Sequence, residues 1–127
     1  MPTVLVIDDD PNVRDILRRT LGRAGYGVLE AAEGEEGLRC VREEAVDLVV
    51  TDLLMPGQEG IETILHLRTE YPDLEIIVVS GGGSLGRADD LLATAVALGA
   101  KRSFEKPIPR AELLAAVEEL VGPGNPG

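Results

Sequence analysis

The sequence predicts an α/β fold in which helices cover both faces of a parallel sheet. Short apolar runs alternate five times with segments of helical periodicity along the 127-residue chain. The runs are continuously apolar, which is typical of parallel strands that are buried on both faces. A composition of 44% hydrophobic and 28% charged residues is that of one globular domain.

The first strand and helix follow directly from the N-terminal residues. The run VLVI at 4–7 predicts a buried strand, and Asp10 and Pro11 then suit a helix N-cap and a first helical position. Spacings of three and four place five apolar residues on one helix face, namely Val13, Ile16, Leu17, Leu21 and Ala24. The sequence GYG at 25–27 ends this helix.

The next two strands and helices follow in the same order. A short strand is expected at 28–31, and a helix is expected over 34–44, where acidic residues come first. A third strand is expected at 48–50, followed by a loop over 55–60. The helix after this loop carries Ile61, Ile64, Leu65 and Arg68.

The last two strands and helices complete the alternation. A strand at 75–79 and a glycine-rich loop at 80–86 precede a helix that ends at Gly99 and carries Leu91, Leu92, Ala95 and Leu98. A fifth strand is expected at 102–105, and Pro109 opens the last helix. The residues of this helix that are expected to face inward are Leu113, Leu114, Val117, Leu120 and Val121.

Five polar side chains fall at the carboxyl ends of the predicted strands. Asp8 and Asp9 end the first strand, and Asp52, Ser80 and Lys106 follow the third, fourth and fifth strands. Right-handed crossovers bring these strand ends to one edge of the sheet, where open α/β sheets bind their ligands. We therefore expect the five side chains to converge, whereas Asp10 is expected only to cap a helix.

The chemistry of these groups points to a metal ion and a phosphoryl group. Neighbouring carboxylates repel one another unless a cation lies among them, and Mg²⁺ binds one or two carboxylates together with phosphate oxygens. An aspartate can also act as a nucleophile and form an aspartyl phosphate. The ammonium of Lys106 and the hydroxyl of Ser80 would then contact the phosphoryl oxygens.

At this point the sequence resembles the receiver domain of two-component response regulators, in particular single-domain CheY-like regulators. The resemblance covers residues 3–121 and rests on VLVIDDD, LVVTDLLMPGQEG, VVS and GAKRSFEKPI. It implies a flavodoxin-like (βα)5 fold, a doubly wound parallel sheet of strand order 2-1-3-4-5 with helices on both faces. It also implies a receiver domain over 1–122, followed by a Gly/Pro tail at 123–127.

The resemblance implies a metal site. Asp52 would be the phosphoacceptor and would share Mg²⁺ with Asp9, while Asp8 would hold the ion largely through water. Leu54 would contribute its backbone carbonyl. No other metal or cofactor is implied.

The resemblance also implies the phosphoryl contacts and the donor. Ser80 would hydrogen-bond the phosphoryl group, and Lys106 would pair with it, with Pro107 after a cis peptide bond. The donor would be a histidine kinase or a histidine phosphotransfer protein. The domain would be a signalling protein rather than an enzyme on other substrates, since it would catalyse only its own phosphorylation and dephosphorylation.

Two departures from the family pattern concern the reporting of phosphorylation. The family carries an aromatic residue three positions before the lysine, where this chain has Ser103. Phe104 is one position away and, because side chains alternate along a strand, is expected in the core. The segment between Ser80 and Lys106 is also longer than usual, so we expect the glycines at 81–83 and the following helix to report phosphorylation.

Charge and composition limit the partners and the compartment. A net charge of −11 argues against direct nucleic-acid binding, and no apolar run reaches the ~20 residues of a membrane span. A single cysteine, Cys40, and the lack of a signal peptide favour the cytoplasm. Lys101 and Arg102 stand where DNA-binding relatives have a dimer-forming acidic pair, so a monomer is expected. His66 is expected on the surface of a helix.

Two other functions fit the sequence less well than a receiver domain does. A phosphatase of the haloacid-dehalogenase type would use Asp8 and Asp10, but Asn12 stands where a hydroxyl residue is expected and Asp52 would have no role. A flavodoxin-like flavin binder would need aromatic residues for stacking, and the chain has two Tyr, one Phe and no Trp. The sequence SGGGSLG lacks the Lys-Ser/Thr of a phosphate-binding P-loop.

Overall fold

The strands form one parallel sheet. The computed structural model describes residues 1–53, 59–81, 96 and 99–124. The strands are β1 (Thr3–Ile7), β2 (Gly27–Ala31), β3 (Leu48–Asp52), β4 (Glu75–Gly81) and β5 (Arg102–Lys106). They pair in the order β2-β1-β3-β4-β5, which confirms the expected flavodoxin-like topology.

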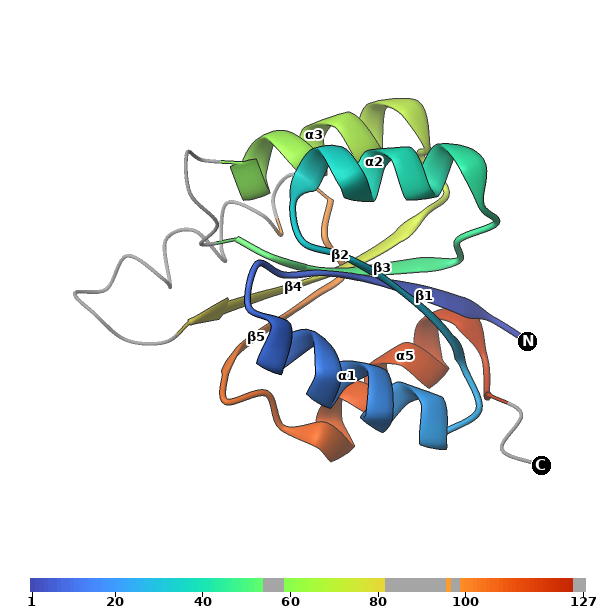
Figure 1. Cartoon of the computed structure of the whole chain (residues 1–127). Coiled ribbons are helices and arrows are strands. Elements are labelled where there is room, and N and C mark those ends of the chain that lie inside the picture. The colour runs from blue at the N-terminus through green and yellow to red at the C-terminus, as the bar shows by residue number, and fades with distance from the viewer. Residues whose placement is uncertain (54–58, 82–95, 97–98, 125–127) are drawn as a thin grey trace.

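Helices cover both faces of this sheet. The described helices are α1 (Pro11–Arg23), α2 (Gly34–Glu43), α3 (Glu59–Glu70) and α5 (Arg110–Val121). Figure 1 shows α2 and α3 on one face, and α1 and α5 on the other. The helix expected to carry Leu91, Leu92, Ala95 and Leu98 lies outside the described residues, as do most of the loops expected at 55–60 and 80–86.

Alternate residues of the central strands supply two separate cores. Leu5 and Ile7 of β1 pack towards α2 and α3, in a cluster that includes Ile64 and Leu67. Val4 and Val6 pack towards α1 and α5, in a cluster that includes Leu17, Leu21, Leu113 and Val117. Because both of their faces are buried, the central strands are apolar along most of their length, as predicted, whereas the edge strands β2 and β5 are mostly half-buried.

Three strands run further than their apolar runs predicted. β3 extends to Asp52, β4 extends beyond Ser80, and β5 includes Lys106, so these residues lie within strands rather than after them. The reason is that the parallel ladder continues through them, with Asp52 opposite Val79. Backbone pairing therefore fixes the direction of all three side chains.

Two expectations about helices are corrected by the structure. Pro109 is the N-cap of α5, not its first helical residue, because the helix begins at Arg110. Ile16 was expected on the buried face of α1 but is 48% exposed, while Leu17 and Leu21 are buried. The contact stripe of α1 is thus narrower than the apolar spacing suggests, and Ile16 lies at its margin.

Asp10 caps α1 as predicted. Its side chain accepts a hydrogen bond of 2.9 Å from the backbone N–H of Asn12, and Pro11 begins the helix. Such a cap contributes about 1 kcal/mol to the free energy of unfolding.

A glycine allows α2 to approach β1 closely. An added Cβ at Gly37 would lie 2.4 Å from Cδ1 of Ile7, which is closer than real contacts allow. Ile7 is the last residue of β1 and directly precedes Asp8. The absence of a side chain at Gly37 therefore lets α2 pack directly against the end of β1, next to the acidic residues.

The two ends of the described chain lie at the amino edge of the sheet. Thr3 begins β1 opposite Gly27, and the hydroxyl of Tyr26 donates a 2.8 Å hydrogen bond to the carbonyl of Gly122, just after α5. Figure 1 shows the N-terminus and the end of α5 on the side opposite the strand carboxyl ends. Among the described residues, no helix is long and apolar enough to cross a bilayer.

Candidate functional site

Three carboxylates meet at the carboxyl ends of β1 and β3, which are neighbours in the sheet. Asp8 is 1% exposed and Asp52 is 4% exposed, whereas Asp9 faces solvent. One carboxylate oxygen from each of the three lies within 4.8 Å of the others. The expected convergence of these acids is therefore seen in the structure.

Lys106 reaches both buried carboxylates from β5. Its Nζ donates hydrogen bonds of 2.8 Å to Oδ2 of Asp8 and 2.9 Å to Oδ2 of Asp52. The lysine side chain is 21% exposed, so these ion pairs are shielded from most of the solvent. One ammonium thus bridges two acids that come from different strands.

Strand register explains why Lys106 and Asp52 meet. Phe104 and Val79 pair in the sheet and both pack towards α1 and α5. Lys106 lies two residues beyond Phe104, and Asp52 pairs with Val79, so both side chains belong to this same face.

Ser80 lies at the same edge but on the other face of the sheet, one residue beyond Val79. It is fully buried, and its Oγ has no hydrogen-bond partner among the described residues. A buried hydroxyl without a partner costs about 1–3 kcal/mol, so a group that accepts its proton would bind favourably there. The structure thus brings Ser80 to the same edge of the sheet as the acids but forms no hydrogen bond between its hydroxyl and them.

Backbone groups and one arginine hold Asp8 in place. The N–H of Asp10 donates a 2.9 Å hydrogen bond to Oδ1 of Asp8, and Nη1 of Arg14 donates a 2.7 Å hydrogen bond to the Asp8 carbonyl. Sequence reasoning gave Asp10 only its capping role and missed Arg14. Residue spacing in the sequence does not predict the hydrogen bond from Arg14, because it depends on how α1 is oriented relative to the end of β1.

The environment of the cluster raises the pKa of both Asp8 and Lys106, for different reasons. Burial raises the pKa of Asp8 above its usual value, although the hydrogen bond from Lys106 opposes the shift. Burial alone would lower the pKa of Lys106, but its hydrogen bonds to Asp8 and Asp52 outweigh burial and raise that pKa. Lys106 therefore remains an ammonium at neutral pH.

The donor set fits a hard divalent cation. The cluster sets three carboxyl groups against the one ammonium of Lys106, and oxygen ligands of this kind suit Mg²⁺. Leu54, expected to add a backbone carbonyl, lies outside the described residues.

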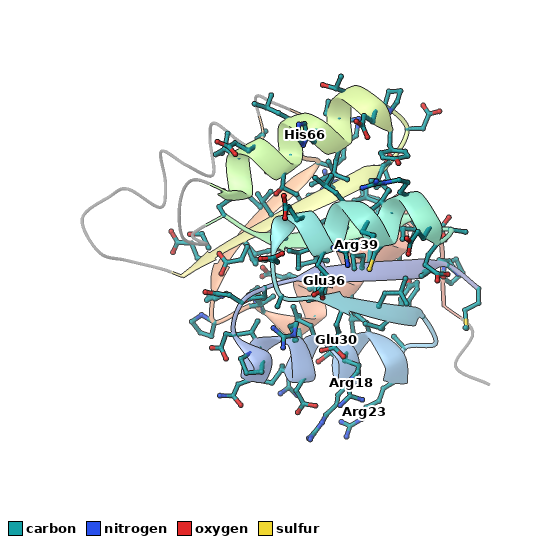
Figure 2. The ribbon with its side chains drawn as sticks, turned by 45° about the horizontal axis from the view of Figure 1, so that its top comes forward. Arg18, Arg23, Glu30, Glu36, Arg39 and His66 are labelled. Atoms are coloured by element: carbon teal, nitrogen blue, oxygen red, sulfur yellow. The ribbon has the colours of Figure 1, made fainter. Side chains whose placement is uncertain are left out.

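The geometry also bears on the other candidate residues. Because Asp10 directs its carboxylate to the helix backbone, it does not pair with Asp8 as the phosphatase alternative requires. Burial and then nearby glutamates raise the pKa of the Cys40 thiol, so this cysteine is not an activated nucleophile. His66 is exposed on α3, as expected (Figure 2).

Comparison with known proteins agrees with this geometry. The family model for the response regulator receiver domain matches residues 4–118. Sporulation initiation phosphotransferase F of Bacillus subtilis is 30% identical over 118 residues, which cover 93% of this chain and 92% of that protein. A crystal structure of the response regulator TrrA of Thermotoga maritima, in complex with Mg²⁺-BeF, is 32% identical with a TM-score of 0.80, and covers 95% of this chain and 100% of that one.

Several relatives are longer than this chain. The uncharacterized transcriptional regulatory protein YrkP of Bacillus subtilis is 36% identical over 114 residues, which cover 90% of this chain but 47% of that protein. The chain thus spans about half the length of that relative and a quarter of an Azospirillum brasilense regulator, NtrC.

Proposed function

Because the chain belongs to the family of response regulator receiver domains, we propose that Asp52 is its phosphoacceptor. Receiver domains of response regulators take phosphoryl groups from histidine kinases or phosphotransfer proteins, and we propose such a donor here. The observation that carries the assignment is the position of Asp52. It is buried at the end of β3, within reach of two further acids and bonded to Lys106.

The transfer makes one bond and breaks one. A carboxylate oxygen of Asp52 attacks the phosphorus of a phosphohistidine, and the imidazole leaves with the electron pair of the P–N bond. Lys106 Nζ, 2.9 Å from Asp52 Oδ2, is placed to follow the negative charge onto a phosphoryl oxygen. Ser80, whose Oγ has no hydrogen-bond partner among the described residues, would donate a hydrogen bond to another phosphoryl oxygen once its hydroxyl turns towards Asp52.

The three acids would together hold Mg²⁺. Asp9 and Asp52 would ligate Mg²⁺ directly, while Asp8 and the carbonyl of Leu54 would complete its surroundings. When bound, the ion would neutralise charge on the transferring phosphoryl group. Asp8 itself is held by the Asp10 N–H and by Lys106, so it keeps its orientation as charge moves through the site.

We place the receiver domain within residues 1–122 and treat 123–127 as a Gly/Pro tail. We propose a cytoplasmic monomer that acts only on itself and does not bind nucleic acid directly. The net charge of −11 supports the lack of direct nucleic-acid binding, and the pairing of Arg102 with Glu119 of the same chain supports the monomer.

The reporting of phosphorylation remains a prediction. Phe104 packs in the core shared with α1 and α5, in agreement with its expected role, while Ser103 occupies the place of the family's aromatic switch. Most of the segment expected to respond, residues 81–92, lies outside the described residues. Hydrogen exchange with and without beryllofluoride should change most across 81–92. A response confined to Phe104 would contradict the prediction.

Intact-mass measurement after incubation with acetyl phosphate and Mg²⁺ tests the phosphoacceptor. The wild type should gain one labile phosphoryl group, and Asp52→Asn should gain none. Asp10→Asn is the matched control, because asparagine also caps a helix and the backbone N–H is unchanged. Full labelling of Asp52→Asn, or loss of labelling only in Asp10→Asn, would overturn the assignment.

A further inference from the structure

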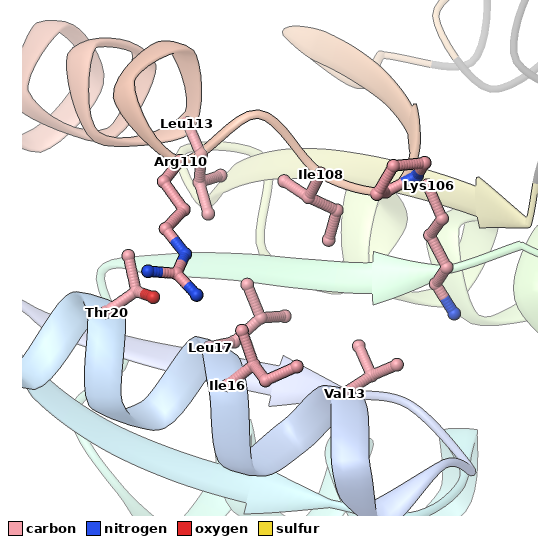
Figure 3. Close-up of a pocket in the computed structure, with 9 residues that line it drawn as sticks. Val13, Ile16, Leu17, Thr20, Lys106, Ile108, Arg110 and Leu113 are labelled. Atoms are coloured by element: carbon pink, nitrogen blue, oxygen red, sulfur yellow. The ribbon is translucent and has the colours of Figure 1, made fainter.

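A groove separates α1 from the segment that leads from β5 into α5. Figure 3 shows its walls, with Ile16 and Leu17 on α1 facing Ile108 and Leu113 on the other side. The hollow has a volume of about 330 Å³ and is mostly apolar. A smaller hollow of about 100 Å³ continues it past Ile16 along α1. Volumes of roughly 300–1,000 Å³ are usual for sites that bind small organic molecules.

Ile16 is one of the exposed large apolar side chains among the described residues, and it lines the groove. It is 48% exposed, although it belongs to a helix whose neighbouring residues, Leu17 and Leu21, are buried. An apolar molecule in the groove would cover Ile16 and gain about 25 cal/mol for each Å² of apolar surface removed from water.

One end of the groove is positively charged. The Arg110 guanidinium lies beside Thr20 in Figure 3, and Arg19 and Arg23 line the same end. Within the described part of the chain, no carboxylate forms an ion pair with Arg23 or Arg110. An unbalanced cationic end is notable in a protein whose net charge is −11.

The other arginines of α1 have carboxylate partners. Arg19 pairs with Asp15 at 3.0 Å, and Arg18 pairs with Glu30 of β2 at 3.5 Å. Figure 2 shows Arg18 near Glu30, with Arg23 farther along α1. The lysine at the opposite end, Lys106, has its ammonium engaged with two carboxylates, so only its aliphatic stem serves the groove.

We propose that this groove binds a small carboxylate with a compact apolar body, such as a medium-chain fatty acid. The carboxylate lies between Arg110 and Thr20, where a guanidinium can donate two parallel hydrogen bonds to it. The apolar body lies over Ile16 and between Ile108 and Leu113. The site shares only the aliphatic stem of Lys106 with the acidic cluster, and it does not depend on the assignment of Asp52.

Octanoate is the probe for this site, with octanol as its uncharged counterpart. In ¹H–¹⁵N NMR titrations of the whole chain, octanoate should shift the amides around Ile16, Ile108 and Leu113 in a saturable manner. Octanol should bind roughly ten-fold more weakly, since the charge-assisted hydrogen bonds are lost. The Arg110→Gln substitution should weaken octanoate binding by a similar factor and leave octanol binding unaffected.

Two controls make the result decisive. Arg42→Gln removes an exposed arginine from α2, remote from the groove, and should leave octanoate binding unchanged. Ile16→Ser should weaken both probes, because it removes apolar contact rather than charge. Equal binding of octanoate and octanol, or an unchanged affinity in Arg110→Gln, would overturn the proposal. Concentration-dependent shifts of these amides without octanoate would identify a second copy as the occupant and would also overturn it.

Discussion

Replacing Lys106 by methionine isolates the electrostatic role of the bridging ammonium. Methionine keeps a long, flexible side chain but removes both hydrogen bonds to the buried carboxylates of Asp8 and Asp52. The acidic cluster then contains three carboxylates and no compensating charge. We expect the metal-free variant to be much less stable than the wild type, because buried like charges repel.

The size of the effect follows from the burial of the pair. Removing one partner of a buried ion pair costs about 3–5 kcal/mol. Since Lys106 is 21% exposed, we expect a loss near the lower end, about 3 kcal/mol. For a domain of this size, that loss corresponds to a fall in melting temperature of roughly 10 °C.

The pH dependence of the variant has a definite sign. Burial raises the folded-state pKa of Asp8 above its usual 3.8, so this carboxyl contributes stability below pH 3.8 and loses it as the pH rises through the folded-state pKa. Lys106→Met removes a hydrogen bond that lowers this pKa. The variant should therefore regain stability as the pH falls from 7. In the wild type, the raised pKa of Lys106 means that its contribution is present below pH 10.5 and is lost only at more alkaline pH.

Urea denaturation in EDTA and in millimolar Mg²⁺ measures the effect. The loss should be largest in EDTA and smaller in Mg²⁺, because the cation supplies the missing positive charge. Lys101→Met is the matched control, since Lys101 is exposed and should contribute within about 0.5 kcal/mol. A metal-free Lys106→Met protein as stable as the wild type would refute the reasoning.

Three further predictions concern other parts of the molecule. Mg²⁺ at ~100 times its dissociation constant should stabilise the wild type by about 2.7 kcal/mol in thermal melts, and Asp9→Ala should lose most of this response; identical wild-type melts in EDTA and Mg²⁺ would exclude the metal site. Gly37→Ala should cost about 1–3 kcal/mol in urea denaturation, because the added Cβ meets Ile7, whereas Gly22→Ala, with open space around it, should stabilise α1 by about 0.4–1 kcal/mol. Alkylation of Cys40 by iodoacetamide should reach half its maximal rate at a higher pH in the folded protein than in urea, since burial and nearby glutamates raise its pKa; an equal or lower midpoint would contradict this.

The strands could be predicted from the sequence because their apolar runs are short and separated by clear turn signals. Their ends could not be placed to the residue. Thr51 and Asp52 are polar yet buried, and they continue β3 because its backbone pairs with β4. Hydropathy does not reveal a buried polar residue that is satisfied by partners distant in the chain, such as Lys106.

The sequence was sufficient to predict that the residues of the candidate site lie at one edge of the sheet, but not how their side chains contact one another. Placing Asp52 and Lys106 at strand ends required only the alternation of strands and helices. That one ammonium bridges two carboxylates, and that the Ser80 hydroxyl lies on the other face, depends on the registers of β3, β4 and β5. The solvent exposure of Ile16 likewise depends on how α1 is rotated about its axis against the sheet. Helical periodicity does not determine this rotation closely enough to tell whether Ile16 is buried.

The arrangement of the chain ends has a practical consequence for experiments on intact complexes. The start of β1 and the segment after α5 lie together at the amino edge of the sheet, where Tyr26 holds Gly122. The acidic cluster is at the opposite edge, about five residues of strand away, or roughly 17 Å. A biotin tether attached before β1 or directly after α5 would therefore leave that edge pointing away from the sensor surface. A donor protein could then be captured in a defined orientation, with its approach to Asp52 unobstructed.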